Sequence, residues 1–228
     1  MENKTRQSSE TRQRLLMAAY RIFAENGYRQ TTVRDICQEA QVNVAAVNYH
    51  FGDKEKLYLA VCKAACGISE DKAPDPTFKV PTDAAPEEKL RVFVQSFLQH
   101  IMTAPRPDPA NQNMKWKLMA REMNDPTPGL SMMIKEMIRP RFLQLSGIVR
   151  DFLGEGCPDS LVRSCCFSIV GQCLHYRFSR HVVMQLNPEQ KFDEKSIQQI
   201  AGHIVSFSLH GLQGIAKQNT EYKSQKPE

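Results

Sequence analysis

The sequence has no long apolar run. No stretch approaches the roughly eighteen consecutive apolar residues that a membrane-spanning helix needs. The first ten residues, MENKTRQSSE, are charged and polar, and they show neither the apolar segment of a signal peptide nor a mitochondrial-type presequence. We therefore expect a soluble, intracellular protein without a membrane partner.

Common catalytic motifs are also missing. The chain has no Gly-rich phosphate loop, no HExxH zinc motif, no GxSxG turn and no evident pair of catalytic carboxylates. No strand-like alternation, internal repeat or low-complexity tract is present either. We predict no catalytic residue and no cofactor for this chain.

The seven cysteines are an odd number, and most of them lie within helical patterns. Cys62 and Cys66 are one helical turn apart, and Cys165 and Cys166 are adjacent. No second Cys/His pair completes the four ligands that a zinc site usually needs. In a chain without an export signal, cysteines are expected to be reduced core residues, so we predict neither disulfides nor a metal site.

Length and charge leave a nucleic-acid partner possible. The 228 residues suit one large domain or two smaller ones, and a hydrophobic share of 41% is enough to build a core. The net charge of +5 and the pI near 8.8 are a mild basic bias. Such a bias permits binding to nucleic acid without demonstrating it.

Two short helical patterns lie between Thr31 and Phe51, in TTVRDICQEAQVNVAAVNYHF. Ile36 and Ala40 give the first an apolar face, and Val44 and Val47 do the same for the second. Two short helices joined by a tight turn have the geometry of a helix-turn-helix, whose second helix enters the major groove of DNA. An ordinary helical hairpin inside an all-α enzyme or small-molecule-binding protein remains the alternative.

Local signals mark the ends of these helices. Thr32 can cap the first one, with Asp35 three residues later as in a capping box, and Asn43 can cap the second. A preceding helix from about Ser9 to Asn26 carries an apolar stripe that supports the pair, and Gly27 follows at its C-terminal cap.

The rest of the chain is also helical in pattern. Further helices are expected at about 53–66, 86–103, 113–124, 130–153, 159–184 and 193–217. Pro140 should kink or break the helix at 130–153. The sequence thus predicts an all-α protein of about nine helices.

A Pro-rich stretch sets the expected domain boundary. We predict a DNA-binding domain over residues 1–68, with its helix-turn-helix motif at 32–51, a linker or loop at 69–86, a second domain at 87–217 and a flexible tail at 218–228.

Three stretches of the N-terminal region, LLMAAYRIFAENGY at 15–28, TTVRDICQEA at 31–40 and VNYHFGDKEKLY at 47–58, resemble the DNA-binding domain of the TetR family of bacterial repressors. In the C-terminal half, AREMNDPTPG at 120–129, MIRPRF at 137–142 and VGQCLHYRFSRHVV at 170–183 resemble the ligand-binding domain of the CecR subgroup of that family. The resemblance implies a three-helix helix-turn-helix domain followed by a larger helical domain for ligand binding and dimerisation.

The chain departs from the family pattern at two places. The turn usually has glycine where this chain has Gln41, so Gln41 must adopt a less comfortable conformation or the turn must follow another path. The start of the recognition helix often carries a Gly-Thr pair, and here Ala45 and Ala46 stand in its place.

The resemblance also implies which residues contact DNA. Val44 and Ala45 are small enough for close approach to thymine methyl groups, and Asn48 is best placed to pair with an adenine. Tyr49, His50 and Lys54 match phosphate-binding positions of the family. The full set of implied DNA-binding residues is Thr32, Arg34, Asn43, Val44, Ala45, Asn48, Tyr49, His50 and Lys54.

Basic residues of the first helix are ambiguous, since Arg12 and Arg14 suit contact with the DNA backbone or simple solvation equally well. Arg121 is equally open: it can pair with Glu122 or a neighbouring acid, or bind an anionic ligand.

An apolar ligand pocket is expected in the second domain, with core packing as the alternative for each residue. The candidate lining residues are Trp116, Met119, Met123, Phe142, Cys173, His175 and Tyr176. The last two long helices have apolar faces that the family uses for dimerisation. The implied function is that of a cytoplasmic bacterial repressor, a homodimer that binds a palindromic operator in double-stranded DNA and leaves it when a small-molecule effector binds.

Overall fold

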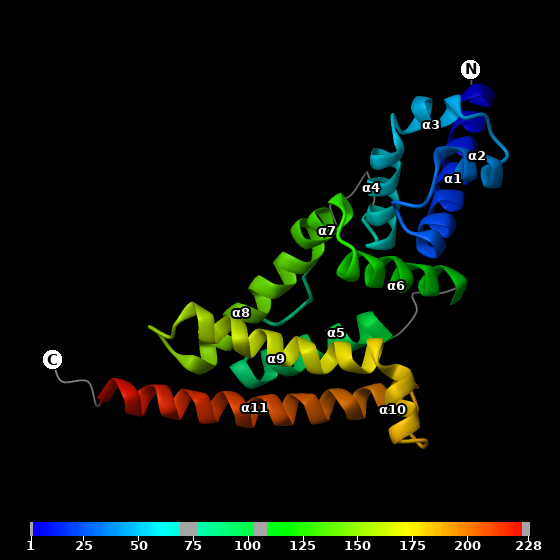
Figure 1. The fold of residues 1–228 in the computed structure, drawn as a ribbon. Coiled ribbons are helices and arrows are strands. Elements are labelled where there is room, and N and C mark those ends of the chain that lie inside the picture. The colour runs from blue at the N-terminus through cyan, green and yellow to red at the C-terminus, as the bar shows by residue number, and fades with distance from the viewer. Residues whose placement is uncertain (1, 69–76, 103–108, 225–228) are drawn as a thin grey trace. The chain divides into compact units, whose positions relative to one another are not determined.

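The computed structural model describes residues 2–68, 77–102 and 109–224. Every regular element in these ranges is a helix, which confirms the all-α prediction (Figure 1). Most of the expected linker, residues 69–76, and the last part of the expected tail, residues 225–228, lie outside the described residues. Among the described residues, no helix is both long and apolar enough to cross a membrane.

The chain divides into two compact units by its internal contacts. The first unit combines Met1–Asp75 with Pro105–Ile138, and the second combines Pro76–Ala104 with Arg139–Glu228. The expected second domain began at residue 87 and had no interruption. The contacts differ from this expectation, because they group residues 105–138 with the N-terminal unit.

The first unit is built around a long helix, α1 (Glu2–Asn26), against which α2 (Val33–Ala40), α4 (Lys54–Ala65) and α6 (Pro109–Asn124) pack. The recognition-helix candidate is α3 (Ala45–His50), and α7 (Pro128–Met133) packs on α4. The core of this unit consists of fully buried apolar side chains that include Leu15, Phe23, Ile36, Val47, Leu57, Val61 and Leu118. The helix expected to begin near Ser9 begins at Glu2, so it is longer than its apolar stripe.

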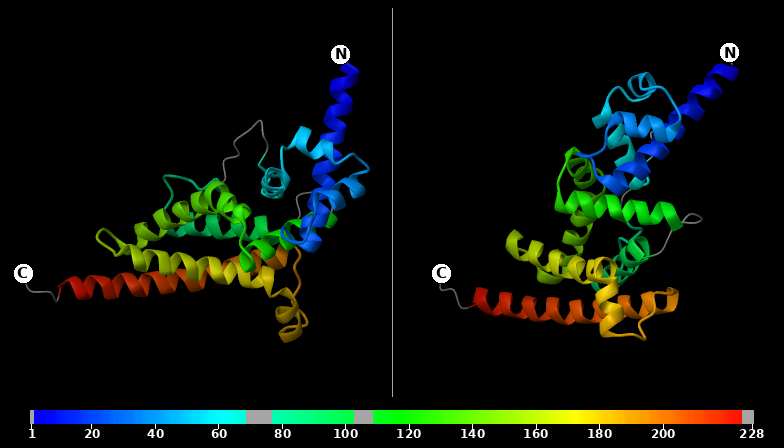
Figure 2. Two further views of the ribbon diagram at one scale, coloured as in Figure 1. Left: turned by 45° about the horizontal axis from the view of Figure 1, so that its top comes forward. Right: turned by 45° about the vertical axis from the view of Figure 1, so that its right-hand side comes forward.

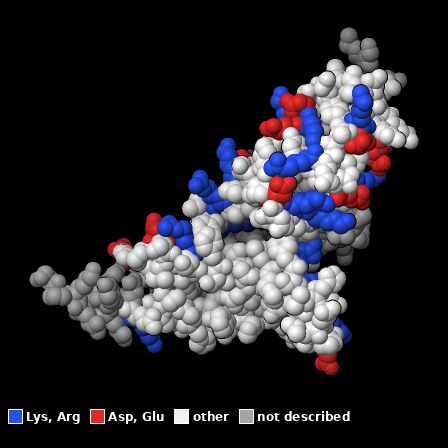
Figure 3. All heavy atoms as spheres, viewed as in Figure 1, with Lys and Arg blue, Asp and Glu red and all other residues white. Residues whose placement is uncertain are grey.

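The second unit is a bundle of α5 (Pro86–Met102), α8 (Arg139–Leu153), α9 (Asp159–Phe178) and α11 (Glu194–Ser224), with the short α10 (Arg180–Leu186) after α9. Helix α11 packs on α5, α8 and α9, and it runs beside α9 in both views of Figure 2. The surface over α9 and α11 carries few charged side chains in the view of Figure 3. Helix α11 continues to Ser224, beyond the expected end near Lys217.

Two of the expected helices are divided in the structure. The one expected at 130–153 consists of α7, a π-helix (Ile134–Ile138) and α8. Pro140 has no N–H group and its ring crowds the carbonyl of Glu136, so the expected disruption is present there as a wider helical turn. The helix expected at 159–184 breaks at Ser179. The described residues therefore contain eleven α-helices and one π-helix, compared with about nine expected.

All seven cysteines are free, and six of them are buried, as expected of core residues. Burial raises the pKa of the Cys173 thiol to about 12 and also raises that of Cys62. These thiols remain protonated near neutral pH and pack as small apolar groups.

Candidate nucleic-acid interface

Helix α2 begins with the expected capping box. Asp35 N–H donates to the Thr32 hydroxyl oxygen over 3.2 Å, and Thr32 N–H donates to the Asp35 carboxylate over 2.9 Å. These hydrogen bonds hold the pKa of Asp35 below its ordinary value. Both side chains are exposed at the N-terminus of α2, where backbone N–H groups favour an anion.

The turn between α2 and α3 is strained at Gln41. Its φ of 53° and ψ of 50° place it in the left-handed helical region, the first of the two outcomes expected from the missing glycine. It is the one non-glycine residue with positive φ in the part of the chain that the structure describes. Val42 N–H donates to the Cys37 oxygen over 3.0 Å, which closes α2 and turns the chain toward α3.

Asn43, the expected cap of α3, lies one residue before the N-cap residue Val44, and its side chain bonds the first residue of the helix. Its Oδ1 accepts a hydrogen bond from Ala45 N–H at 2.9 Å, and its backbone oxygen accepts one from Ala46 N–H at 2.9 Å. Since Oδ1 already bonds the backbone, the side chain of Asn43 positions the recognition helix.

Helix α3 has one buried face and one exposed face. Val47 is fully buried and Phe51, just after the helix, is 9% exposed, so both pack into the core of the unit. On the opposite side, Tyr49 is 80% exposed and Val44 is 45% exposed. Ala45 and Asn48 are also exposed, as is Arg34 on α2, and His50 is half-buried. The candidate base-reading side chains Arg34, Ala45 and Asn48 are therefore all accessible to solvent.

Two cations stand on aromatic rings beside this surface. The Arg12 guanidinium lies 4.9 Å from the centroid of the Phe51 ring, and Lys54 Nζ lies 4.5 Å from that of Tyr28. Partial burial lowers the pKa of Lys54. The rings restrict where these cations can lie and leave both at the edges of the helix-turn-helix.

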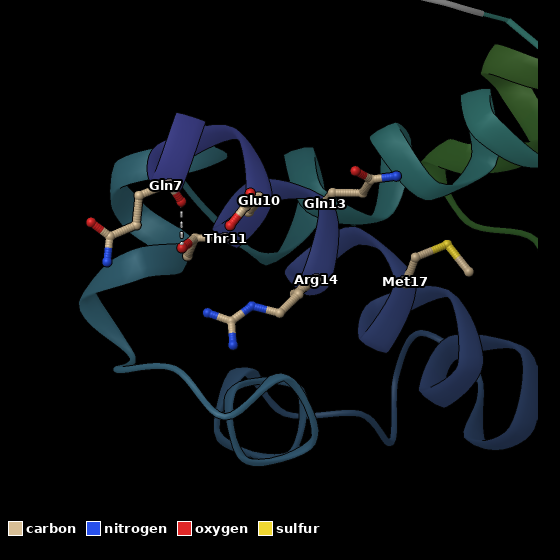
Figure 4. A pocket seen from close by; sticks show the side chains of 6 residues that line it. All are labelled: Gln7, Glu10, Thr11, Gln13, Arg14 and Met17. Carbon is tan, nitrogen blue, oxygen red and sulfur yellow. Dashed lines mark hydrogen bonds between the residues drawn. The ribbon is translucent and has the colours of Figure 1, made fainter. Parts of the chain in front are cut away.

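A hollow of about 620 Å³ follows the N-terminal half of α1 (Figure 4). Six side chains line it, those of Gln7, Glu10, Thr11, Gln13, Arg14 and Met17. The Thr11 hydroxyl donates to the Gln7 backbone oxygen over 2.9 Å, while the exposed Arg14 side chain projects away from the helix axis.

The candidate ligand-binding residues fall into two sets. Trp116 and Met119 are buried on α6 and Met123 is 48% exposed there, all within the first unit. Phe142, Cys173, His175 and Tyr176 belong to α8 and α9 of the second unit. Cys173 is buried, His175 is exposed, and Phe142 and Tyr176 are half-buried. The seven candidate residues therefore belong to two different units.

Four residues that were not among the expected site residues form close polar contacts in the first unit. Arg121 donates to the backbone oxygens of Ala24 and Glu25 at the C-terminus of α1. Buried Glu122 accepts hydrogen bonds from Tyr58 and Thr127. The partners that the structure gives Arg121 are therefore carbonyl groups of α1 and not Glu122, and its binding of an anionic ligand stays a prediction.

These features define a helix-turn-helix protein of all-α fold. They are the buried core under the two short helices, the hydrogen bonds at the starts of those helices and the exposed face of α3. Comparison with known families identifies the family within this class. Residues 15–61 match the model of the TetR family of bacterial regulatory proteins, and residues 86–212, more than half of the chain, match the C-terminal domain of the dual regulator CecR. The chain belongs to the TetR family, with a C-terminal domain of the CecR type, and is a DNA-binding transcriptional regulator rather than an enzyme.

Two curated relatives align over nearly the whole chain. The transcriptional dual regulator CecR of Shigella flexneri is 24% identical over 220 residues, which cover 94% of this chain and 97% of the relative. The transcriptional repressor NicS of Pseudomonas putida is 25% identical over 215 residues, covering 92% and 95%.

Solved structures share the fold. HlyIIR, a hemolysin II transcriptional regulator, superimposes with a TM-score of 0.54 at 22% identity and covers 87% of this chain and 97% of its own. The regulator FadR from Bacillus subtilis, in complex with stearoyl-CoA, gives a TM-score of 0.53 at 18% identity and covers 87% and 98%.

Proposed function

We propose that the protein is a repressor that binds a palindromic operator as a homodimer and leaves it when a small molecule binds to its C-terminal domain. The observation that carries the proposal is the exposed face of α3. Val44, Ala45, Asn48 and Tyr49 are exposed together on this face, Tyr49 at 80%, and a contiguous exposed face of this kind supports an interaction surface.

Base reading is assigned to Arg34, Ala45 and Asn48. Asn48 can donate to and accept from an adenine edge, and Ala45 is small enough to touch a thymine methyl group. Thr32, Tyr49, His50 and Lys54 are assigned to the phosphates, where they fix the register of α3 in the groove. Asn43 and Val44 lie directly before α3, and we assign them to contacts with the wall of the DNA groove at the start of that helix.

Arg14 is the proposed backbone contact of α1. It is exposed beside a polar hollow, and its carbon stem can extend toward a phosphate without losing a buried contact. Arg12 is oriented by the Phe51 ring at the end of α3, so a phosphate beside that end is within the reach of a guanidinium.

The second copy is proposed to pack on α9 and α11. Helix α9 carries no Asp, Glu, Lys or Arg from Ser164 to Tyr176, and α11 carries none from Ser196 to Ala216. Phe167 and Phe207 are exposed on this surface, at 64% and 66%, whereas Ile200, Ile204 and Leu212 are buried within the protomer. A face that lacks charged side chains and exposes aromatic rings is typical of a homodimer interface.

The effector is proposed to act by preferring one conformation. A ligand that binds better to the conformation unsuited to DNA weakens DNA binding by its difference in affinity, and typical couplings of about 1–3 kcal/mol correspond to roughly 5- to 150-fold. FadR contains stearoyl-CoA, but at 18% identity its ligand does not identify the one bound here.

Footprinting on the intergenic DNA next to the gene tests this function. We expect a symmetric footprint with two half-sites about one helical turn, or roughly 34 Å, apart. The experiment is repeated with a panel of hydrophobic and antibiotic-like compounds, one of which should abolish the footprint. Protection of a single half-site would contradict the dimer, and no protection at any salt concentration would contradict the proposed role at this promoter.

A further inference from the structure

Helix α6 lies outside the helix-turn-helix sequence, yet two adjacent residues of it hold two helices of the DNA-binding unit. Arg121 contacts the C-terminus of α1, and Glu122 contacts α4 through Tyr58. These contacts join positions that are 97 and 64 residues apart in the chain. The packing of α1 and α4 therefore includes a segment that the N-terminal family match at 15–61 does not reach.

Arg121 closes α1. Its Nε donates to the Ala24 oxygen over 3.1 Å, and a second guanidinium nitrogen donates to the Glu25 oxygen. The last carbonyls of a helix have no partner within the helix and carry partial negative charge, so a cation there stabilises the end of the helix. The guanidinium also lies against Gly27, where an added Cβ would be 3.2 Å from Nη1.

Glu122 is a buried acid, only 1% exposed. One carboxylate oxygen accepts from the Tyr58 hydroxyl and from the Thr127 hydroxyl at 2.7 Å, and the other accepts from Thr127 N–H at 3.2 Å. Burial raises the pKa of Tyr58 above its ordinary value, so its hydroxyl keeps the proton that it donates. A buried carboxyl group is costly unless it is hydrogen-bonded, and these three donors satisfy it.

Helix α7 approaches α4 too closely for a side chain at Gly129. A Cβ added there would lie 2.9 Å from both Cys62 Sγ and Tyr58 Cε1. Thr127, which bonds Glu122, also caps α7 through Gly129 N–H at 3.1 Å. Glu122, Thr127 and Gly129 thus fix one side of the Tyr58 ring.

The other side of Tyr58 leads to a proposed DNA contact. Its ring packs against Phe23, with centroids 4.8 Å apart, and against Tyr28, with centroids 4.7 Å apart. Tyr28 carries Lys54 Nζ on its face at 4.5 Å. A continuous line of contacts therefore runs from the buried acid on α6 to the first residue of α4.

We propose that Glu122 is a positioning residue for DNA binding, which fixes Tyr58 and Tyr28 and through them holds Lys54 in place for a phosphate. The proposal rests on the proposed contact between Lys54 and the DNA backbone. It extends the DNA-binding unit to α6 and α7, so that the helix-turn-helix domain is completed by residues from the C-terminal half of the sequence.

The salt dependence of DNA binding tests this role. The probe is an operator duplex that the wild-type full-length chain selects from a random-sequence library. Each phosphate contact contributes about 0.9 to the slope of log affinity against log salt concentration. We expect Glu122→Gln and Lys54→Gln to lower the slope by the same amount per protomer. The double variant should lower it no further, since both changes remove one contact.

Asp125→Asn is the matched control. It removes an acid directly after the same helix, whose ion pair with Arg29 is exposed, at 3.2 Å, and such pairs contribute little. We expect its slope to equal that of the wild type. If Glu122→Gln does not fold, Tyr58→Phe replaces it, because this change removes only the hydroxyl group that the carboxylate accepts from.

The outcomes separate the inference from the function on which it rests. A folded Glu122→Gln or Tyr58→Phe variant with the wild-type slope would overturn the positioning role, even if its melting temperature falls. Additive losses in the double variant would overturn it as well. A Lys54→Gln variant with an unchanged slope would contradict the phosphate assignment itself, and a wild-type protein that selects no sequence would contradict the proposed function.

Discussion

Gln41 adopts a conformation that glycine adopts more easily. In the left-handed region an L-residue brings its Cβ close to the following carbonyl oxygen, at a cost of about 1–2 kcal/mol. The turn between α2 and α3 needs this conformation because Val42 N–H must reach the Cys37 oxygen to end α2. The strain lies directly before the recognition helix, so a change at Gln41 affects stability first and DNA binding only through the angle of α3.

Gln41→Gly should raise the free energy of unfolding by about 0.5–1 kcal/mol, because the relief of strain exceeds the larger backbone entropy of glycine in the unfolded chain. Urea denaturation followed by the fluorescence of Trp116, the one tryptophan of the chain, measures this in the first unit. Gln38→Gly, within α2, is the control and should lower stability by about 1 kcal/mol. An equal decrease in the free energy of unfolding in both variants would show that residue 41 is not strained.

The roles of single residues could be predicted where their partners are close in sequence. The caps at Thr32 and Asn43 were expected because each bonds a backbone group two or three residues away. The roles of Arg121 and Glu122 were not, because helical periodicity does not indicate which residue of a distant helix comes into contact. The adjacent charges of the pair suggested an ion pair, whereas the fold turns one toward carbonyl groups and the other into the core.

At the scale of elements, an aspartate takes part in the N-terminal capping of both α2 and α4. On α4 it is the N-cap residue, Asp53, and on α2 it is Asp35, which completes the capping box of Thr32. Asp53 Oδ1 accepts a hydrogen bond from Lys56 N–H at 2.7 Å. On α2, the Asp35 carboxylate accepts one from Thr32 N–H. Hydrogen bonds lower the pKa of both carboxyl groups, that of Asp53 mainly through the backbone of Lys56 and that of Asp35 mainly through the Thr32 side chain. The charged carboxylate is therefore favoured in the folded state.

The contribution of Asp53 to the free energy of unfolding depends on pH. Because the folded-state pKa of Asp53 is below 3.8, its contribution to stability is fully present above that value and is lost as the pH falls through the lowered pKa. Asp53→Asn keeps a capping oxygen without a charge. We expect its deficit in unfolding free energy, measured by Trp116 fluorescence, to be constant near neutral pH and to shrink as the pH falls through the lowered pKa of Asp53. A deficit that does not change with pH would contradict the assignment.

The divided helices show what periodicity leaves out at this scale. Apolar residues recur at helical spacing through 130–153, so the sequence favours one helix with a kink at Pro140. The structure accommodates the proline by widening the preceding turn, Ile134–Ile138, to a π-helix, and the apolar face continues on both sides of it. The boundary between the two compact units lies at the end of that turn, between Ile138 and Arg139.

At the scale of the whole molecule, the sequence predicted two all-α parts but not their composition. The Pro-rich stretch at 69–86 indicated a boundary, and that boundary stays a prediction. The return of residues 105–138 to the first unit depends on the packing of α6 on α1 and of α7 on α4. The spacing of apolar residues within one helix does not indicate which other helix it packs against. The packing of α6 on α1 and of α7 on α4 could therefore not be predicted from the sequence.

The proposed dimer makes a prediction at this scale. Phe207→Asp places a charge in an apolar interface without disturbing the protomer core, since Phe207 is 66% exposed. We expect dimerisation at least about tenfold weaker, because a buried unpaired charge costs more than 1.4 kcal/mol. Analytical ultracentrifugation measures the equilibrium. The control is Leu186→Asp on α10, which is 82% exposed, lies off the α9 and α11 face, and should leave the dimer unchanged. A wild-type equilibrium for Phe207→Asp would exclude this face.

The central claim is that α3 reads base identity through Asn48. The most direct measurement is the affinity of the wild type and of Asn48→Ala for a selected operator and for versions in which single A·T pairs are replaced by G·C, all at one salt concentration. At one position of each half-site, replacing the A·T pair should lower the affinity of the wild type roughly 5- to 150-fold. Asn48→Ala should no longer distinguish the two base pairs there, with an unchanged salt slope. If Asn48→Ala keeps the wild-type pattern of base preferences, Asn48 does not read the operator and the claim is wrong.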